Sequence, residues 1–258
     1  MNKENPTGEF NEFVDIVRKL RKECPWDRIQ THLSLRRCLL EETYEVLEAI
    51  DNDNKSELKK ELGDILLQVI FHSNIAEDNN DFTLKDVIKF ETKKLVERHP
   101  HVFGDVKVKD SEEVKKNWEK IKKNEGRKSI IDGIPEELPA LLKAYRIQEK
   151  ASKTGFDWKD ANPVYEKVVE EINELKENVD LGKPIKEIED ELGDVLFSLV
   201  NYARFLKINP EDALRKTIKK FRNRFQKIEK YAEENNKVLD EMSIEEMDTI
   251  WDKAKEEI

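Results

Sequence analysis

The chain carries the same pattern of residues twice. The segment ELGDILLQVIF begins at Glu61, and ELGDVLFSLVNYARF begins at Glu191. An acidic segment precedes each of them, LLEETYEVLEAI before the first and VVEEINELKE before the second. Matched positions in the two halves lie 126 to 133 residues apart. A spacing this constant indicates an internal duplication whose period is far longer than that of solenoid repeats.

The duplication predicts two similar domains. Helical periodicity stops between residues 122 and 139, where glycines and prolines mark turns. We therefore expect an N-terminal domain over 1–123, a linker over 124–138 and a C-terminal domain over 139–258. Glycine and proline are scarce, at eight residues each, which favours helices over turn-rich sheets. The predicted fold is all-α, with tandem duplicated helical-bundle domains.

The ELGD segments combine apolar and acidic side chains in one helix. At 100° per residue, the apolar residues of the first segment cover most of the helix circumference: Leu62, Leu66, Leu67, Val69, Ile70 and Phe71. We therefore expect this helix to be buried. Glu61, Asp64 and Gln68 form one narrow polar stripe along it. Since burying an unpaired carboxylate is costly, a compensating group must face this stripe.

Four carboxylates of the first half are expected to converge on that stripe. The turn-like sequence DNDNKS at 51–56 separates the acidic helix from the ELGD helix, so the two should form an antiparallel hairpin. Acids one helical turn apart share a face, which groups Glu42 with Glu45 and Glu61 with Asp64. Such a cluster repels itself unless a hard divalent cation neutralises it. Oxygen ligands favour Mg²⁺ or Mn²⁺ for that role. A lone EExxE would instead suggest a solvated helix face.

A basic pair follows each acidic hairpin, spaced four residues apart on a predicted helix: Lys94 with Arg98, and Lys220 with Arg224. Such pairs can hold phosphate oxygens or can be ordinary surface charges. Trp118 and Trp251 recur near the end of each half. Each tryptophan can stack on a base or anchor the packing of its helix.

Charge and composition exclude several classes of function. The net charge of −10 and the isoelectric point near 5.2 argue against general nucleic-acid binding, because phosphate backbones require basic surfaces. Cys24 and Cys38 show no CxxC spacing, which is typical of a reduced intracellular protein. No apolar stretch is long enough to span a membrane, and the N-terminus lacks the apolar core of a signal peptide. We expect a cytoplasmic protein.

These motifs resemble the MazG-type nucleoside triphosphate pyrophosphohydrolases, an all-α group marked by EExxE followed by ExxD. Here the motif reads EETYE with ELGD, and then EEINE with ELGD. The likeness extends to CPWD, RHPHVF and GFDW and covers nearly the whole chain, which is typical of the two-domain members. It implies the all-α NTP pyrophosphatase fold. It also implies Mg²⁺-dependent hydrolysis of a nucleoside triphosphate between its α and β phosphates, and a homodimer.

The resemblance further implies which residues form the sites. It assigns the metal ligands of the second half to Glu171, Glu174, Glu191 and Asp194, and its nucleotide contacts to Lys220, Arg224 and Trp251. Through the internal repeat, the first-half ligands are Glu42, Glu45, Glu61 and Asp64, and the first-half nucleotide contacts are Lys94, Arg98 and Trp118. Glu41 and Glu170, which begin the two EExxE motifs, are candidates for orienting the attacking water.

Two other readings of the acidic hairpins can be tested. A non-enzymatic helical interaction or scaffold protein would explain the apolar helices and the heavy charge, but not the repeated acids in apolar helices. It predicts no Mg²⁺-dependent change in thermal stability. A di-iron carboxylate bundle needs Glu-x-x-His pairs, and none occurs in or beside either hairpin.

Overall fold

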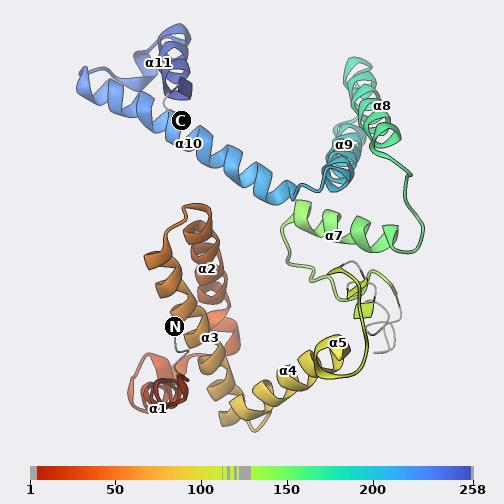
Figure 1. Cartoon of the computed structure of the whole chain (residues 1–258). Helices are drawn as coiled ribbons and strands as arrows, with labels where there is room; N and C mark the ends of the chain where they lie inside the picture. Colours follow the sequence, from red (N-terminus) through yellow and green to blue (C-terminus); the bar gives the residue numbers. More distant parts are fainter. Residues whose placement is uncertain (1–4, 112, 115–116, 119–120, 122–128, 257–258) are drawn as a thin grey trace. The chain divides into compact units, whose positions relative to one another are not determined.

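The computed structural model describes residues 5–111, 113–114, 117–118, 121 and 129–256 (Figure 1). These residues contain helices and no strand, so the all-α prediction is confirmed. Contacts divide the chain into two compact units, Met1–Ile121 and Lys122–Ile258. Residues 124–128 of the predicted linker lie outside the described residues.

The first unit contains five described helices and one 3-10 turn. They are α1 (Thr7–Glu23), a 3-10 turn η1 (Asp27–Ile29), α2 (His32–Asp51), α3 (Lys55–Asp78), α4 (Leu84–Arg98) and the short α5 (Pro100–Phe103). Trp118 is among the described residues, whereas residues 115–116 and 119–120 on either side of it are not.

The second unit repeats the order of the four long helices, with its 3-10 turn at a different place. It contains α7 (Ala140–Ser152), α8 (Ala161–Asp180), α9 (Ile185–Phe205), α10 (Pro210–Glu234), a 3-10 turn η2 (Leu239–Glu241) and α11 (Ile244–Glu256). None of the helices in the described ranges of either unit has the length and apolar character needed to cross a bilayer.

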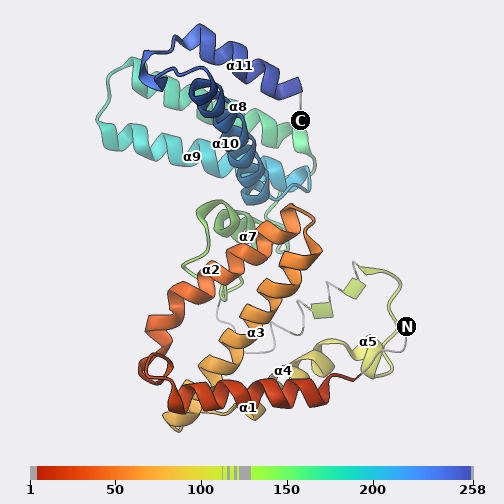
Figure 2. The ribbon, with the colours of Figure 1, turned by 90° about the vertical axis from the view of Figure 1, so that its left-hand side faces the viewer.

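Each unit contains one acidic hairpin, as predicted from the turn at 51–56. Helices α2 and α3 lie side by side in the first unit, and α8 and α9 do so in the second (Figures 1 and 2). The chain reverses through a left-handed residue at the same place in both hairpins, Asp53 with φ 50° and Gly182 with φ 62°. Asn54 then accepts a hydrogen bond from the backbone N–H of Glu57 and caps the start of α3. The turns therefore fix how the acidic helices face each other.

The apolar cores lie in different places in the two units. In the first unit, the core joins α1, α2, α3 and α4 through Val14, Val17, Leu35, Ile70, Phe71, Ile75 and Leu84. In the second unit, a core cluster joins α10 to the chain that follows it through Ile228, Ala232 and Met242. At the end of the α8–α9 hairpin that corresponds to the first-unit core, Asn201 stands in place of Phe71 and is buried together with Ser198.

The prediction that the ELGD helix is buried all round is wrong for the single chain. Ile70 is fully buried, whereas Leu62 is 52% exposed and Leu66 and Val69 are exposed as well. The reason is that α2 and α1 are the main neighbours of α3, and together they cover only part of its surface. The polar stripe behaves as predicted, because Glu61 and Gln68 are buried.

Candidate metal and nucleotide site

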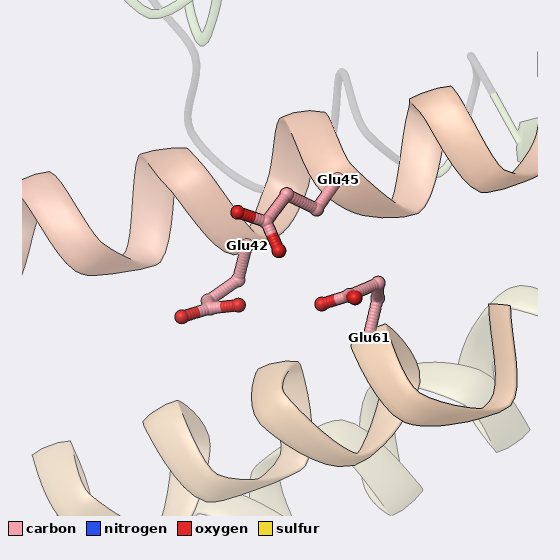
Figure 3. A group of neighbouring side chains, drawn as sticks. All are labelled: Glu42, Glu45 and Glu61. Atoms are coloured by element: carbon pink, nitrogen blue, oxygen red, sulfur yellow. The ribbon is translucent and has the colours of Figure 1, made fainter. Parts of the chain in front are cut away.

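Three carboxylates of the first unit meet between α2 and α3. Oxygen atoms of Glu42, Glu45 and Glu61 all lie within 4.8 Å of one another. Figure 3 shows the three side chains pointing into the space between the two helices. Glu61 is only 1% exposed, so it forms the buried end of this first trio. Asp64 lies outside the trio, but its charge acts on Glu42.

The second unit brings together a related trio. Oxygen atoms of Glu171, Glu191 and Asp194 lie within 4.8 Å of one another. Glu171 is buried in this second trio, and Asn178 Nδ2 donates to Glu191 Oε1 at 3.1 Å. Glu174 lies outside the trio, and its pKa is raised by burial and by the charge of Glu171. Each trio thus uses three of the four predicted positions, and the two omit different ones.

A lysine accompanies each trio, and the sequence reasoning did not identify either one. Lys60 Nζ lies 2.9 Å from Glu61 Oε1, and Lys167 Nζ lies 2.9 Å from Glu171 Oε1. The pKa of each lysine is raised because it donates hydrogen bonds to two neighbouring carboxylates. The two lysines occupy different positions of the repeat, one on α3 and the other on α8. Comparing the two halves for shared residues therefore could not reveal them.

The charges of the first trio are not balanced by the protein alone. The hydrogen bond from Lys60 lowers the pKa of Glu61. The pKa of Glu45 is raised by its hydrogen bond to Glu61 and by the charge of that residue. Burial, followed by the charge of Asp64, raises the pKa of Glu42. Glu61 Oε2 is buried and has no hydrogen-bond partner among the described residues. An unsatisfied buried oxygen beside further carboxylates fits a hard divalent cation such as Mg²⁺.

Replacing Glu42 should make the metal-free protein more stable near neutral pH. The raised pKa means that the folded state keeps a proton on Glu42 above its ordinary pKa of 4.5. Stability is therefore lost as the pH rises from 4.5 through the raised value. Glutamine at this position stays uncharged at every pH. The melting temperature of Glu42→Gln in EDTA should therefore rise relative to that of the unaltered chain across this range. Thermal melts from pH 4 to pH 7.5 measure this.

The matched control for that experiment is Glu48→Gln, an exposed residue on the same helix. Its melting temperature should follow that of the unaltered chain at every pH. With Mg²⁺ present, Glu42→Gln should instead become the less stable protein, because it has lost a ligand. A pH-independent difference between Glu42→Gln and the unaltered chain would contradict the raised pKa of Glu42.

The two residues predicted to orient water both lie outside the trios. Glu41 Oε1 accepts a hydrogen bond from Arg37 Nε at 2.7 Å. Glu170 Oε1 accepts one from Lys167 Nζ at 2.7 Å. Each is about half exposed and is held by a cation on its own helix.

The residues predicted to contact the nucleotide have partners outside the two trios. Lys94 pairs with Glu91 on α4. Trp118 packs its ring edge-on against His99, with centroids 5.0 Å apart. On α10 and α11, the Arg224 guanidinium lies 5.5 Å from the Trp251 ring centroid. Neither Arg224 nor Trp251 lines the cavity described next, and Lys220 on α10 does not line it either.

A cavity of about 270 Å³ adjoins the second trio, and Glu171 and Asp194 line it. Its other walls come from α7, from the loop before α8 and from α9, and they include Gln148, Phe156, Trp158, Phe197, Ser198 and Asn201. Sequence reasoning missed this cavity. The available signal was a difference between the repeats, because Asn201 stands where the first half has Phe71.

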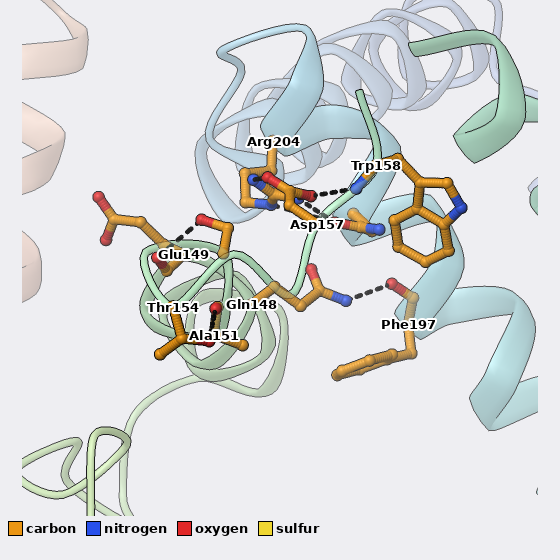
Figure 4. A network of polar contacts seen from close by, with 10 residues as sticks. Gln148, Glu149, Ala151, Thr154, Asp157, Trp158, Phe197 and Arg204 are labelled. Atoms are coloured by element: carbon orange, nitrogen blue, oxygen red, sulfur yellow. Dashed lines mark hydrogen bonds and ion pairs between the residues drawn. The ribbon is translucent and has the colours of Figure 1, made fainter. Parts of the chain in front are cut away.

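Arg204 connects two parts of the cavity wall, the loop before α8 and helix α9. Its Nη1 and Nη2 donate to the two carboxylate oxygens of Asp157 at 3.0 and 2.5 Å, and Nε donates to Asn201 Oδ1 at 3.0 Å (Figure 4). The first unit has a comparable clamp on a different helix. There Arg21 of α1 donates to Asp78 of α3 and to backbone carbonyls of the loop before α2.

Comparisons with known proteins agree with the duplicated pattern. Residues 30–103 and 159–229 match the model of the MazG nucleotide pyrophosphohydrolase domain, so both acidic hairpins are included. The chain is 51% identical to the nucleoside triphosphate pyrophosphohydrolase/pyrophosphatase MazG of Thermotoga maritima, with 95% of each chain covered. It is 38% identical to the nucleoside triphosphate pyrophosphohydrolase of Escherichia coli K12, with 96% of this chain and 97% of that one covered. It is also 50% identical to the uncharacterized protein YabN of Bacillus subtilis, and spans 52% of its length.

Proposed function

Because the chain belongs to the MazG nucleotide pyrophosphohydrolase family, we propose that it hydrolyses nucleoside triphosphates between the α and β phosphates. The products are a nucleoside monophosphate and pyrophosphate. Two relatives named for nucleoside triphosphate pyrophosphohydrolase activity align over almost their whole length. The observation that carries the proposal is the repeated carboxylate trio, which provides an oxygen-rich site in each unit.

Divalent metal binding belongs to this proposal. In the first unit, Glu42, Glu45 and Glu61 would hold Mg²⁺, with Asp64 beside them; the second unit offers Glu171, Glu191 and Asp194, with Glu174 beside them. The unpartnered buried oxygen of Glu61 and the all-carboxylate donor set support this choice of ion. A bound Mg²⁺ lowers the pKa of a coordinated water and neutralises charge on the phosphoryl group.

The protein's own groups would bind the substrate and manage its protons. One carboxylate of each cluster would accept the proton of the attacking water. Lys167, which pairs with Glu171 and lines the cavity, would contact phosphate oxygens of the substrate. Lys220 and Arg224 remain predicted phosphate contacts on α10. Glu41 and Glu170 remain candidates for orienting water.

The direct test is to identify the phosphate product. The full chain with Mg²⁺ is expected to convert a nucleoside triphosphate to the monophosphate and pyrophosphate in equal amounts, and EDTA should stop the reaction. A pyrophosphate-specific assay and a phosphate-specific assay, run side by side on a panel of nucleoside triphosphates, measure this. Orthophosphate without pyrophosphate would refute α,β cleavage. Absence of both products, with no stabilisation by Mg²⁺, would favour a helical interaction protein instead.

We also propose that the chain forms a homodimer through the exposed side of its ELGD helices. Leu62, Leu66 and Val69 are exposed on α3, and Leu192, Leu196 and Leu199 are exposed on α9. A Cβ added at Gly63 or Gly193 would meet no atom within 4 Å, so nothing in the chain itself requires glycine there. Close approach of a second helix would explain both features. Light scattering at micromolar concentration tests the dimer, and a stable monomer would refute it.

A further inference from the structure

The glutamate of each ELGD motif accepts a hydrogen bond from a side chain of its own unit. Glu61 and Glu191 occupy the same position of the repeat. Lys60 Nζ donates to Glu61 Oε1 at 2.9 Å, and Asn178 Nδ2 donates to Glu191 Oε1 at 3.1 Å. In both units, a donor therefore holds one oxygen of this carboxylate.

The two donors come from different positions of the repeat. Helices α2 and α8 have the same length, so Asn178 corresponds to Ala49, which is buried and whose side chain cannot donate. Lys60 corresponds to Asp190, whose carboxylate accepts hydrogen bonds. Neither unit could therefore use the donor position of the other. The hydrogen bond is common to both units, although the residues that provide it are different.

The first unit shows what this hydrogen bond does to the glutamate. Glu61 is 1% exposed and points into the space between α2 and α3 (Figure 3). Lys60 holds its Oε1, while its Oε2 is buried without a hydrogen-bond partner among the described residues. A free carboxylate oxygen, in a trio whose oxygens lie within 4.8 Å of one another, is available to a hard divalent cation.

The charge of Lys60 is balanced outside the trio. Lys60 Nζ also donates to Glu57 Oε1 at 2.8 Å, and the Lys60 side chain is 62% exposed. Water and the Glu57 carboxylate therefore screen the ammonium charge. Lys60 thus supplies Glu61 with a directed hydrogen bond, which is also what the neutral amide of Asn178 supplies in the second unit.

We propose that Lys60 and Asn178 are positioning residues for the two metal sites. Each holds one oxygen of the ELGD glutamate, so that the other oxygen is presented to a divalent cation. Hydrogen bonds of this kind orient metal ligands, and their loss typically costs about 10–100-fold in metal affinity. The inference rests on the metal sites of the proposed function and extends it, because it gives a role to two residues that the repeat does not share.

The test measures divalent-ion binding by one unit at a time. In the full chain, Glu171→Gln with Glu174→Gln leaves the first trio as the intact one. Mn²⁺ alone is the probe, because the free ion is counted by its electron paramagnetic resonance signal, and Mg²⁺ is then added as a competitor. A chain with both trios altered gives the background from other acids. Lys60→Met should raise the Kd for Mn²⁺ by at least about tenfold.

Two further variants separate the hydrogen bond from the charge. Lys60→Arg keeps a donor at this position and should restore the affinity that Lys60→Met loses. Lys59→Met is the matched control, because Lys59 is an exposed lysine next to Lys60 on α3. It removes the same charge and leaves the hydrogen bond to Glu61 in place, so the Kd should not change.

The second unit is tested in the complementary chain, which carries Glu42→Gln and Glu45→Gln. There Asn178→Leu should raise the Kd for Mn²⁺ by at least about tenfold. Asn173→Leu, which replaces an exposed asparagine on the same helix, should leave it unchanged. Lys60→Met should have no effect in this chain, because it acts on the first trio alone.

Melting curves in EDTA distinguish positioning from a role in folding. If Lys60→Met melted at a lower temperature but bound Mn²⁺ as tightly as its parent, Lys60 would be structural and the proposal would be wrong. Tighter binding by Lys60→Met would show that the lysine competes with the metal, which is equally fatal. Equal losses in Lys59→Met and Lys60→Met, or no recovery in Lys60→Arg, would also contradict it.

Failure of the inference can be told apart from failure of the proposed function. If the chain with both trios intact bound no divalent ion above background, the metal sites themselves would be refuted, and the positioning role with them. If that chain bound Mn²⁺ while Lys60→Met and Asn178→Leu bound it equally well in their own units, only the positioning role would be refuted.

Discussion

The chain carrying Glu42→Gln, Glu45→Gln, Glu171→Gln and Glu174→Gln together is expected to release no pyrophosphate above background. The substitutions remove acidic residues from both sites and keep the shape of each side chain. Loss of a metal site removes transition-state stabilisation worth several kcal/mol, which corresponds to a rate loss of roughly a thousandfold or more. The measurement is pyrophosphate release under saturating Mg²⁺ and nucleoside triphosphate.

The matched control for this experiment is Glu48→Gln with Glu177→Gln. These residues are exposed, lie on the same two helices and occupy equivalent positions of the repeat. The control should keep the full rate. Pyrophosphate release by the quadruple variant, after contamination is excluded, would show that the chemistry lies outside both acidic hairpins.

Two double variants, each altered in one half only, show how much each half contributes to the rate of pyrophosphate release. Glu42→Gln with Glu45→Gln leaves the second trio intact, and Glu171→Gln with Glu174→Gln leaves the first trio intact. Both halves keep their predicted ligands, and in the second half Glu171 and Asp194 also line the cavity described above. We therefore expect the second-half pair to cost more of the rate.

Arg204→Met is expected to destabilise the second unit by about 2–3 kcal/mol, between the values for exposed and fully buried ion pairs. The Arg204 and Asp157 side chains are 13% and 25% exposed, so the pair is only partly screened by water. Without the guanidinium, the Asn201 oxygen loses its donor, and the Asp157 carboxylate keeps the hydrogen bond from the backbone N–H of Trp158. Chemical denaturation of the full chain measures the change.

Arg146→Met is the control for that experiment. Arg146 pairs with Glu149 one turn away on α7, where the side chains are 45% and 33% exposed, and such pairs contribute about 0–1 kcal/mol. Adding Asp157→Leu to Arg204→Met should recover part of the loss, because the carboxylate left without its arginine is then gone. If Arg204→Met were as mild as Arg146→Met, the clamp would have no structural importance.

The predicted acids could be found from the sequence because their positions follow from helix geometry alone. Residues at i and i+3 share a face, and a short turn between two helices brings those faces together. The fold could be predicted for the same reason, because each half of the chain repeats two helices joined by a short turn. Periodicity alone could not predict that one side of α3 is exposed in the single chain. An apolar side chain can be covered either by the same chain or by another one, and the pattern is the same in both cases.

The lysines and the cavity could not be predicted because they differ between the two halves. Lys60 and Lys167 neutralise buried acids from different repeat positions, so only the final side-chain geometry identifies them. The clamp likewise comes from α1 in one unit and from α9 in the other, as Arg21 and Arg204. A search for residues shared by the two halves finds the side chains that occur in both and misses those that occur in only one.

The acidic hairpins have a consequence for the order of folding. Their helices are neighbours in sequence and are joined by short turns, so their contacts are local and should form early. Closing either hairpin, however, brings like charges within 4.8 Å of one another. The acidic hairpin can form early because its contacts are local, but its own carboxylates repel one another as it forms. Mg²⁺ in a refolding buffer should therefore accelerate hairpin closure as well as stabilise the folded chain.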